Sequence, residues 1–175
     1  MTLVFDTTPL THFARAGEVE SLRKLCQDCR SVATQSVLEE LRDGLGLHPL
    51  NQDILTATWL EEVRLGEGLD ALRVFTEYTR LLGSSQRDIG EASVLAWAEL
   101  NGATAIVDER AGTNHGRRRN VVVHGTLWLV IRGFRMGELS RGTAVELVDA
   151  LADTEMWFPC HGSDLFDWAG RQGLL

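Results

Sequence analysis

The chain has 175 residues, of which 44% are hydrophobic and 24% charged, and this size suits one well-packed domain and is too small for two. Its formal net charge of −8 argues against a protein that coats nucleic acid with a broadly basic surface. No apolar run approaches the roughly 20 residues that span a bilayer, and the N-terminus lacks the basic region and apolar core of a signal peptide. We therefore expect a cytoplasmic protein with no membrane segment.

The first half of the chain alternates short apolar strands with helices. Residues 3–5 predict a buried strand, which Asp6 follows directly. Thr8 and Pro9 then predict an N-cap and a first helical position, and Gly17 ends the helix. The elements predicted next are a helix at 18–26, a strand at 30–34, a helix from Ser36 to near Gly44, a short helix at 50–57, a strand at 59–65 and an amphipathic helix at 67–83.

The second half continues the alternation. A polar turn at 84–88 leads into a helix at 89–102 with Asp88 as its cap, and strands at 103–108 and 120–125 are followed by helices at 125–136, 140–154 (Ser140 as cap) and 163–173. The helix at 125–136 is apolar on more than one side, which indicates deep burial or a subunit interface. Unbroken apolar strands alternating with helices predict the α/β class, with a parallel sheet covered on both faces.

Three cysteines, Cys26, Cys29 and Cys160, fit reduced thiols better than a disulfide framework. Cys26 and Cys29 have the spacing of a redox or zinc motif, but they lie at the end of a predicted helix rather than after a strand. We interpret them as partly buried structural thiols.

Carboxylates from four distant segments are predicted at one edge of the sheet. Asp6 and Asp108 each follow a strand, and the carboxyl ends of parallel strands share an edge. Helices that cross between parallel strands begin at that same edge, which brings Glu40 and Glu91 there as well.

Each of these acids also has a local interpretation. Ser36 and Glu39 have the spacing of a capping box, which gives Glu39 a role in the helix start and leaves Glu40 without one. Asp88 and Glu91 have a similar spacing, so Glu91 is either part of the helix start or a member of the carboxylate cluster. Asp6, like Asp108, would on its own be read as a turn residue or an N-cap.

Taken together, the four acids favour a metal site. Like charges this close would raise one another's pKa and oppose folding unless a cation lay among them. Oxygen ligands without an organised histidine or cysteine set indicate Mg²⁺ or Mn²⁺. One or two such ions suit phosphodiester hydrolysis, and Thr8 is placed to support a carboxylate or a metal-bound water.

Four stretches of the chain resemble the PIN-domain nucleases, in particular a VapC-like toxin branch: VFDTTPLTHFARAG, VLEEL, GEASVLAWAELNGATAIVDERAG and VVVHGTLWLVIRGFRMGEL. The resemblance runs from residue 3 to about residue 139. It implies a three-layer α/β/α fold with a central, mainly parallel sheet and a Mg²⁺- or Mn²⁺-dependent ribonuclease. Many bacterial members look like the toxin of a VapBC-type pair, held inactive by a small antitoxin and often dimeric.

Carried over by position, the family's acids match Asp6, Glu40, Glu91 and Asp108, and its frequent serine or threonine matches Thr8. Many PIN nucleases have a further aspartate after the one matched by Asp108, where this chain has Glu109 and then Asn114, which leaves one or two metals open. We expect a catalytic domain over 1–139 and a C-terminal helical extension over 140–175 that packs on it.

Residues 110–119 contain four arginines and no acid: Arg110, Arg117, Arg118 and Arg119. The segment follows Asp108, so it is predicted either to hold the phosphates of RNA beside the metal or to form a solvated helix face.

The leading hypothesis is a metal-dependent endoribonuclease, with RNA as substrate and a small antitoxin as partner. A nuclease-inactive PIN-like module that serves binding or assembly is the alternative. An aspartyl-phosphate phosphotransfer domain fits poorly, because no DxD follows the first strand and Lys24 is the only lysine.

Overall fold

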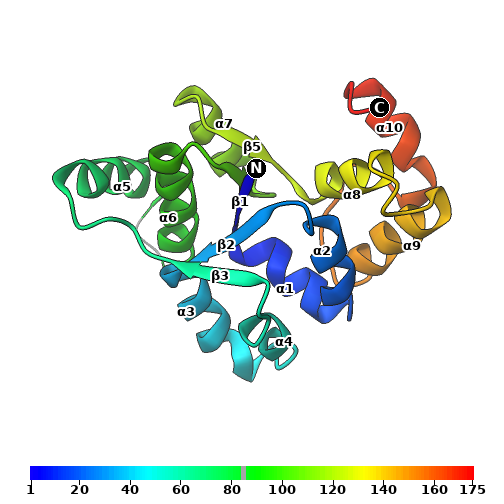
Figure 1. Ribbon diagram of the computed structural model, residues 1–175, viewed down its shortest axis with the longest axis horizontal. Coiled ribbons are helices and arrows are strands. Elements are labelled where there is room, and N and C mark those ends of the chain that lie inside the picture. The colour runs from blue at the N-terminus through cyan, green and yellow to red at the C-terminus, as the bar shows by residue number, and fades with distance from the viewer. Residues whose placement is uncertain (84–85) are drawn as a thin grey trace.

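The computed structural model describes residues 1–83 and 86–175 and contains a five-stranded sheet in which the strand pairings are all parallel (Figure 1). The strands are β1 (Thr2–Phe5), β2 (Arg30–Thr34), β3 (Leu60–Val63), β4 (Thr104–Ile106) and β5 (Val122–His124). They lie in the order β3-β2-β1-β4-β5, so β1 is central. Helices cover both faces, which confirms the predicted α/β class and three-layer arrangement.

The helices that were predicted occur in the predicted order, and the structure adds a helix over residues 110–118, within the arginine segment. They are α1 (Thr7–Arg15), α2 (Val19–Leu25), α3 (Gln35–Asp43), the 3-10 turn η1 (Gly44–Gly46), α4 (Asn51–Leu55), α5 (Leu69–Leu82), α6 (Gln86–Asn101), α7 (Arg110–Arg118), α8 (Thr126–Arg135), α9 (Arg141–Ala152), the 3-10 turn η2 (Gly162–Asp164) and α10 (Leu165–Arg171). Of the turn predicted at 84–88, Ser84 and Ser85 lie outside the described residues.

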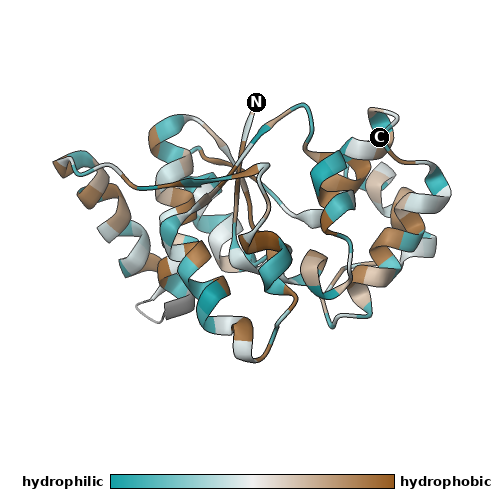
Figure 2. Ribbon diagram, turned by 60° about the horizontal axis from the view of Figure 1, so that its bottom comes forward, coloured by the Kyte–Doolittle hydropathy of each residue, from teal (hydrophilic) through white to brown (hydrophobic). Residues whose placement is uncertain are grey.

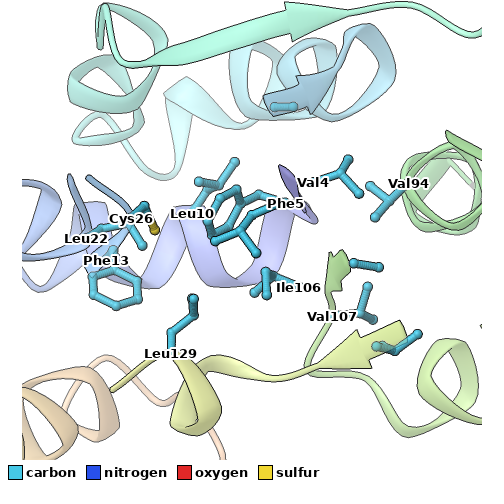
Figure 3. Packing of buried hydrophobic residues seen from close by; sticks show 14 of the residues in the cluster. Val4, Phe5, Leu10, Phe13, Leu22, Cys26, Val94, Ile106, Val107 and Leu129 are labelled. Atoms are coloured by element: carbon cyan, nitrogen blue, oxygen red, sulfur yellow. The ribbon is translucent and has the colours of Figure 1, made fainter. Parts of the chain in front are cut away.

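The core lies on both faces of β1, whose side chains alternate between them. Phe5 packs among apolar residues of α1 and α2, with Leu129 of α8 on the same face, while Val4 points the other way, toward Val94 of α6 (Figure 3). Leu3, Val4 and Phe5 are fully buried. In Figure 2 the apolar colour gathers on the central strands and the helix faces turned to them. Three buried residues in a row explain why β1 is an unbroken apolar run.

Two helix starts differ from those predicted. Thr34, not Ser36, caps α3, because its hydroxyl accepts a hydrogen bond from the Val37 backbone N–H at 3.4 Å. Asp6, not Thr8, is the last extended residue before α1, although its side chain makes no capping hydrogen bond. In both cases the strand runs almost directly into the helix, so the last extended residue takes the cap position. Asp88 is likewise inside the first turn of α6 rather than its cap.

The C-terminal helices share the core of the sheet. Leu129, Val130 and Ile131 of α8 are buried, which accounts for the apolar character of this helix. Buried residues of α9 and α10, among them Val148 and Phe166, belong to the same hydrophobic cluster. Cys26 is buried and Cys29 and Cys160 are partly buried, all three as free thiols, as predicted. No helix in the described part of the chain is both long and apolar enough to cross a membrane.

Candidate active site

A cleft of about 710 Å³ lies where α1, α3, α4 and α6 meet at the carboxyl ends of the central strands. Carboxylates gather along part of its wall: Asp6, Glu40, Asp43, Asp88, Glu91 and Glu109. The remaining lining residues are Thr7, Thr8, Thr11, His12, Arg15, Gly44, Leu47, His48 and Asn51. Three of the four predicted ligands, from three distant segments, therefore share one cavity.

Asp6 occupies the junction between β1 and α1. Its backbone N–H donates to the Ile106 carbonyl at 3.1 Å, which continues the pairing of β1 with β4 by one residue. The side chain is only 5% exposed. Burial, and then the nearby charges of Glu91 and Glu40, raise the pKa of Asp6 well above its usual range. The metal-free site thus disfavours a charge on this carboxyl.

Glu40 reaches the cleft from the second turn of α3. Thr7 donates its hydroxyl hydrogen to Glu40 Oε2 at 2.5 Å, so the residue after Asp6 orients this carboxylate. Glu40 also lies against α6 at Gly90, where an added Cβ would come within 2.5 Å of Glu40 Oε1. The glycine of the G-E-A sequence therefore leaves space for the carboxylate of another helix.

Glu91 is a second buried carboxyl in an electrostatically unfavourable position. It is 5% exposed, and its Oε1 has no hydrogen-bond partner among the side chains and backbone groups that the structure describes. Burial, and then the charges of Glu109 and Asp88, raise the pKa of Glu91 to about 7, against the effect of a hydrogen bond from the Gly112 backbone. A Cβ on Gly112 would overlap Glu91 Oε1, so this glycine lets α7 approach.

Glu109 and Asp88 line the cleft although neither was predicted as a ligand. Glu109 is the extended residue just before α7, and Asp88 lies in the first turn of α6. Glu109 directly follows the predicted ligand Asp108, and Asp88 lies three residues before Glu91, about one helical turn away. The sequence showed both carboxylates, but it gave no signal that they line the same cleft as the predicted ligands.

Asp108 is placed differently from the other three predicted acids. Its Oδ1 accepts from the Thr126 backbone N–H at 2.8 Å, and its Oδ2 accepts from the Thr126 hydroxyl at 2.7 Å. Burial raises the pKa of Asp108, and these two hydrogen bonds oppose that shift. Asp108 is not among the residues that line the cleft. It joins the end of β4 to the first turn of α8, and the Gly-Thr pair at 125–126 supplies the space and the donors.

A model of the PIN-domain family matches residues 2–161. This chain belongs to the PIN-domain family. The match includes every carboxylate of the cleft and extends through α9.

A solved structure supports the same fold. It is VapBC2 from Rickettsia felis, solved bound to a DNA fragment from their promoter; the match has a TM-score of 0.51 at 14% identity and covers 71% of this chain and 98% of that one. At this identity the likeness concerns the fold. A comparison with curated protein sequences finds no match.

The arginines of this PIN domain divide into two groups. Arg119 donates to both oxygens of Glu99 at 2.7 Å, forms a further ion pair with Glu77, and lies over the Tyr78 ring at 5.3 Å. It therefore ties α5, α6 and α7 together, and its predicted role in holding phosphate stays a prediction. Arg110, Arg117 and Arg118 are exposed on α7 and make no ion pair within the described residues.

The donor set of the cleft suits a hard divalent cation. Carboxylate oxygens dominate it, and the Glu91 oxygen that lacks a partner is what a cation at this point would satisfy. In the part of the chain that the structure describes, no three His, Cys, Asp or Glu side chains are arranged as a finished metal site. Thr8 lines the cleft next to Thr7.

Proposed function

We propose that this PIN domain is a Mg²⁺- or Mn²⁺-dependent endoribonuclease. The observation that carries the proposal is Glu91, a buried carboxyl with a pKa of about 7 and an oxygen without a partner in the described residues, at the edge of a cleft with five further carboxylates. Buried like charges oppose folding, and a bound cation would stabilise such a cluster by neutralising the repulsion between its carboxylates.

In this proposal Asp6, Glu40, Glu91 and Glu109 hold one or two ions, and Asp108 positions the strand end. When bound, the cation supplies Lewis-acid activation of water and neutralises charge at phosphorus. Thr7 holds the Glu40 carboxylate in one orientation through its hydrogen bond. Asp6 and Glu91 carry protons more readily than ordinary carboxyls and release them as the cation enters. Arg110, Arg117 and Arg118 are proposed to hold the RNA backbone beside the cleft.

The biological setting we propose is a VapBC-type pair, with this chain as the toxin, a small antitoxin as its partner, and RNA in the cytoplasm as its substrate. The PIN family and the fold shared with VapBC2 support this setting. A homodimer is part of the proposal and is checked by light scattering.

The test is cleavage of end-labelled RNA by the purified chain with MnCl₂, beside Glu91→Gln and an EDTA control. We expect manganese-dependent internal cleavage that the variant loses. Absence of cleavage by a folded wild type would contradict the proposal.

The alternative is a binding or assembly module without nuclease activity. It is favoured by one observation, that no three suitable side chains within residues 1–83 and 86–175 form a finished metal site. It predicts a folded protein that binds a partner chain and leaves RNA intact in manganese.

A further inference from the structure

The end of the cleft away from the acids has a different chemistry. Along α1, Thr7, Thr11 and Arg15 succeed one another at four-residue spacing, with His12 beside them, and all line the cleft. This stripe runs about 12 Å from the acids to Arg15, at 1.5 Å per helical residue. His48 adds a second imidazole there. Along α1 the lining of the cleft therefore passes from the Asp6 carboxylate to neutral and cationic groups over about 12 Å, which is more than the length of one nucleotide unit.

His12 is held in one tautomer by the C-terminal part of the chain. Thr154 donates its single hydroxyl hydrogen to the Leu151 carbonyl at 2.6 Å, so its oxygen accepts from His12 Nδ1, 2.6 Å away. The proton of a neutral His12 is thus on Nδ1, and Nε2 is left with a lone pair for a ligand. Burial, and then the charges of Arg15 and His48, lower the pKa of His12, which favours this neutral form.

Asn51 provides an independent sign that a polar ligand binds here. It lines the cleft and is 1% exposed, and its side-chain Oδ1 has no hydrogen-bond partner in the described residues. A buried amide oxygen without a partner costs free energy that a bound donor recovers. Among the described residues, Arg15 forms an ion pair with the exposed Glu155 at 3.5 Å, and such a surface pair is readily exchanged for a phosphate.

We propose that this end of the cleft is a ribonucleotide subsite, in which His12 Nε2 accepts a hydrogen bond from a ribose 2′-hydroxyl while Arg15 and His48 face the adjoining phosphate. This rests on the proposed ribonuclease function and adds how RNA is told from DNA. A neutral acceptor fixed beside the Arg15 guanidinium matches a 2′-hydroxyl that lies next to a phosphate, and deoxyribose lacks that hydroxyl. Thr154 is then a positioning residue, because it acts only by fixing the tautomer of His12.

The experiment compares fluorescence anisotropy of the full chain with a labelled 12-nucleotide RNA of mixed sequence and with the matched DNA, in CaCl₂ at neutral pH. We expect wild type to prefer RNA about tenfold, the size of one hydrogen bond to a desolvated acceptor. His12→Phe should remove this preference by weakening RNA binding and leaving DNA binding unchanged. Thr154→Val should reduce it to about threefold, and Thr154→Ser, which keeps the hydroxyl, should retain it.

Arg15→Leu is the matched control, because loss of a phosphate contact should weaken RNA and DNA equally. Thermal unfolding of every variant separates loss of contact from loss of fold. A preference for RNA that survives in His12→Phe would overturn the subsite. Wild type that cleaves RNA yet binds both strands equally would overturn the subsite alone, whereas wild type that neither binds nor cleaves RNA would overturn the proposed function with it.

Discussion

The junctions that follow β1 and β4 have the same sequence pattern and use their aspartates differently. Asp6 faces the cleft, and its side chain makes no capping hydrogen bond to α1. Both carboxylate oxygens of Asp108 accept hydrogen bonds from Thr126. The two aspartates differ in which helix begins next to their carboxylates. The helix after β1 follows Asp6 directly, whereas Asp108 meets the first turn of α8, which begins 18 residues later. At these two junctions, the acid that lines the cleft is the one that does not accept from Thr126 at both of its oxygens.

The largest expected difference between the two junctions is in metal affinity. Asp6→Asn should weaken Mn²⁺ binding more than about 100-fold, because it removes a carboxylate from the donor set, whereas Asp108→Asn should change it less than about threefold. Calorimetric titration of Mn²⁺ into the metal-free variants measures both. An equal loss of Mn²⁺ affinity in the two variants would indicate that Asp108 is also a metal ligand.

Stability in EDTA at neutral pH should change with opposite sign at the two junctions. Asp108→Ala leaves the Thr126 N–H and hydroxyl without their acceptor and should lower the free energy of unfolding by about 1–3 kcal/mol. Asp6→Ala removes a buried charge that its neighbours disfavour and should raise the free energy of unfolding by about 1 kcal/mol. Urea unfolding of the two variants beside wild type decides the signs. Destabilisation by Asp6→Ala would indicate that Asp6 supports the fold.

The pH dependence of stability should trace Glu91. Its pKa rises from an ordinary 4.5 to about 7 on folding, so the folded chain binds the proton more tightly and is most stable below pH 4.5 as far as this group is concerned. Its contribution is lost as the pH rises through about 7. Glu91→Gln should flatten this loss and raise the melting temperature at pH 8 by about 5 °C, corresponding to about 2 kcal/mol.

Scanning calorimetry in EDTA from pH 5 to pH 8 measures the effect. The control is Glu61→Gln at an exposed position, which should lower the melting temperature only slightly and equally at each pH, because it removes a surface ion pair with Arg30. A Glu91→Gln profile parallel to that of wild type would contradict the assignment.

The smallest expected effect concerns α7, which follows the β4 junction in the chain. Arg118→Ala should weaken RNA binding uniformly and reduce the slope of log affinity against log salt by about 1. Arg119→Ala should leave the slope unchanged and cost stability, because Arg119 joins Glu77 and Glu99. Salt titrations of RNA binding distinguish the two. A reduced slope in Arg119→Ala would restore its predicted contact with RNA.

Most of the fold could be predicted because hydrophobic periodicity marks strands and helices, and connection rules place the carboxyl ends of parallel strands at one edge. The same reasoning brought Asp6, Glu40 and Glu91 together. It did not indicate that Glu109 lines the cleft while Asp108 accepts from Thr126, because adjacent residues point in different directions and the Asp108 contact depends on where α8 begins. Thr34 and Ser36 raise the same difficulty, since only the tightness of the strand-to-helix connection decides which hydroxyl caps α3.

Arg119 could not be recognised as structural, because its partners Glu77 and Glu99 are 42 and 20 residues away and only the packing of α5, α6 and α7 brings them to it. The metal ligands, the RNA contacts and the domain boundary at 139/140 stay predictions. His12 gave no signal in the sequence, because its role depends on Thr154 at the other end of the chain.

The two glycines that accommodate the carboxylates have a consequence for mutational tolerance. Gly90 and Gly112 contribute no side chain, yet a single methyl group at either would occupy the space of a glutamate oxygen. In a scan of all substitutions scored by function, both should therefore be as intolerant as Glu40 and Glu91 themselves, even to alanine. Such a scan would therefore identify two functionally essential positions that have no side chain, because selection there preserves the space that a neighbouring carboxylate occupies.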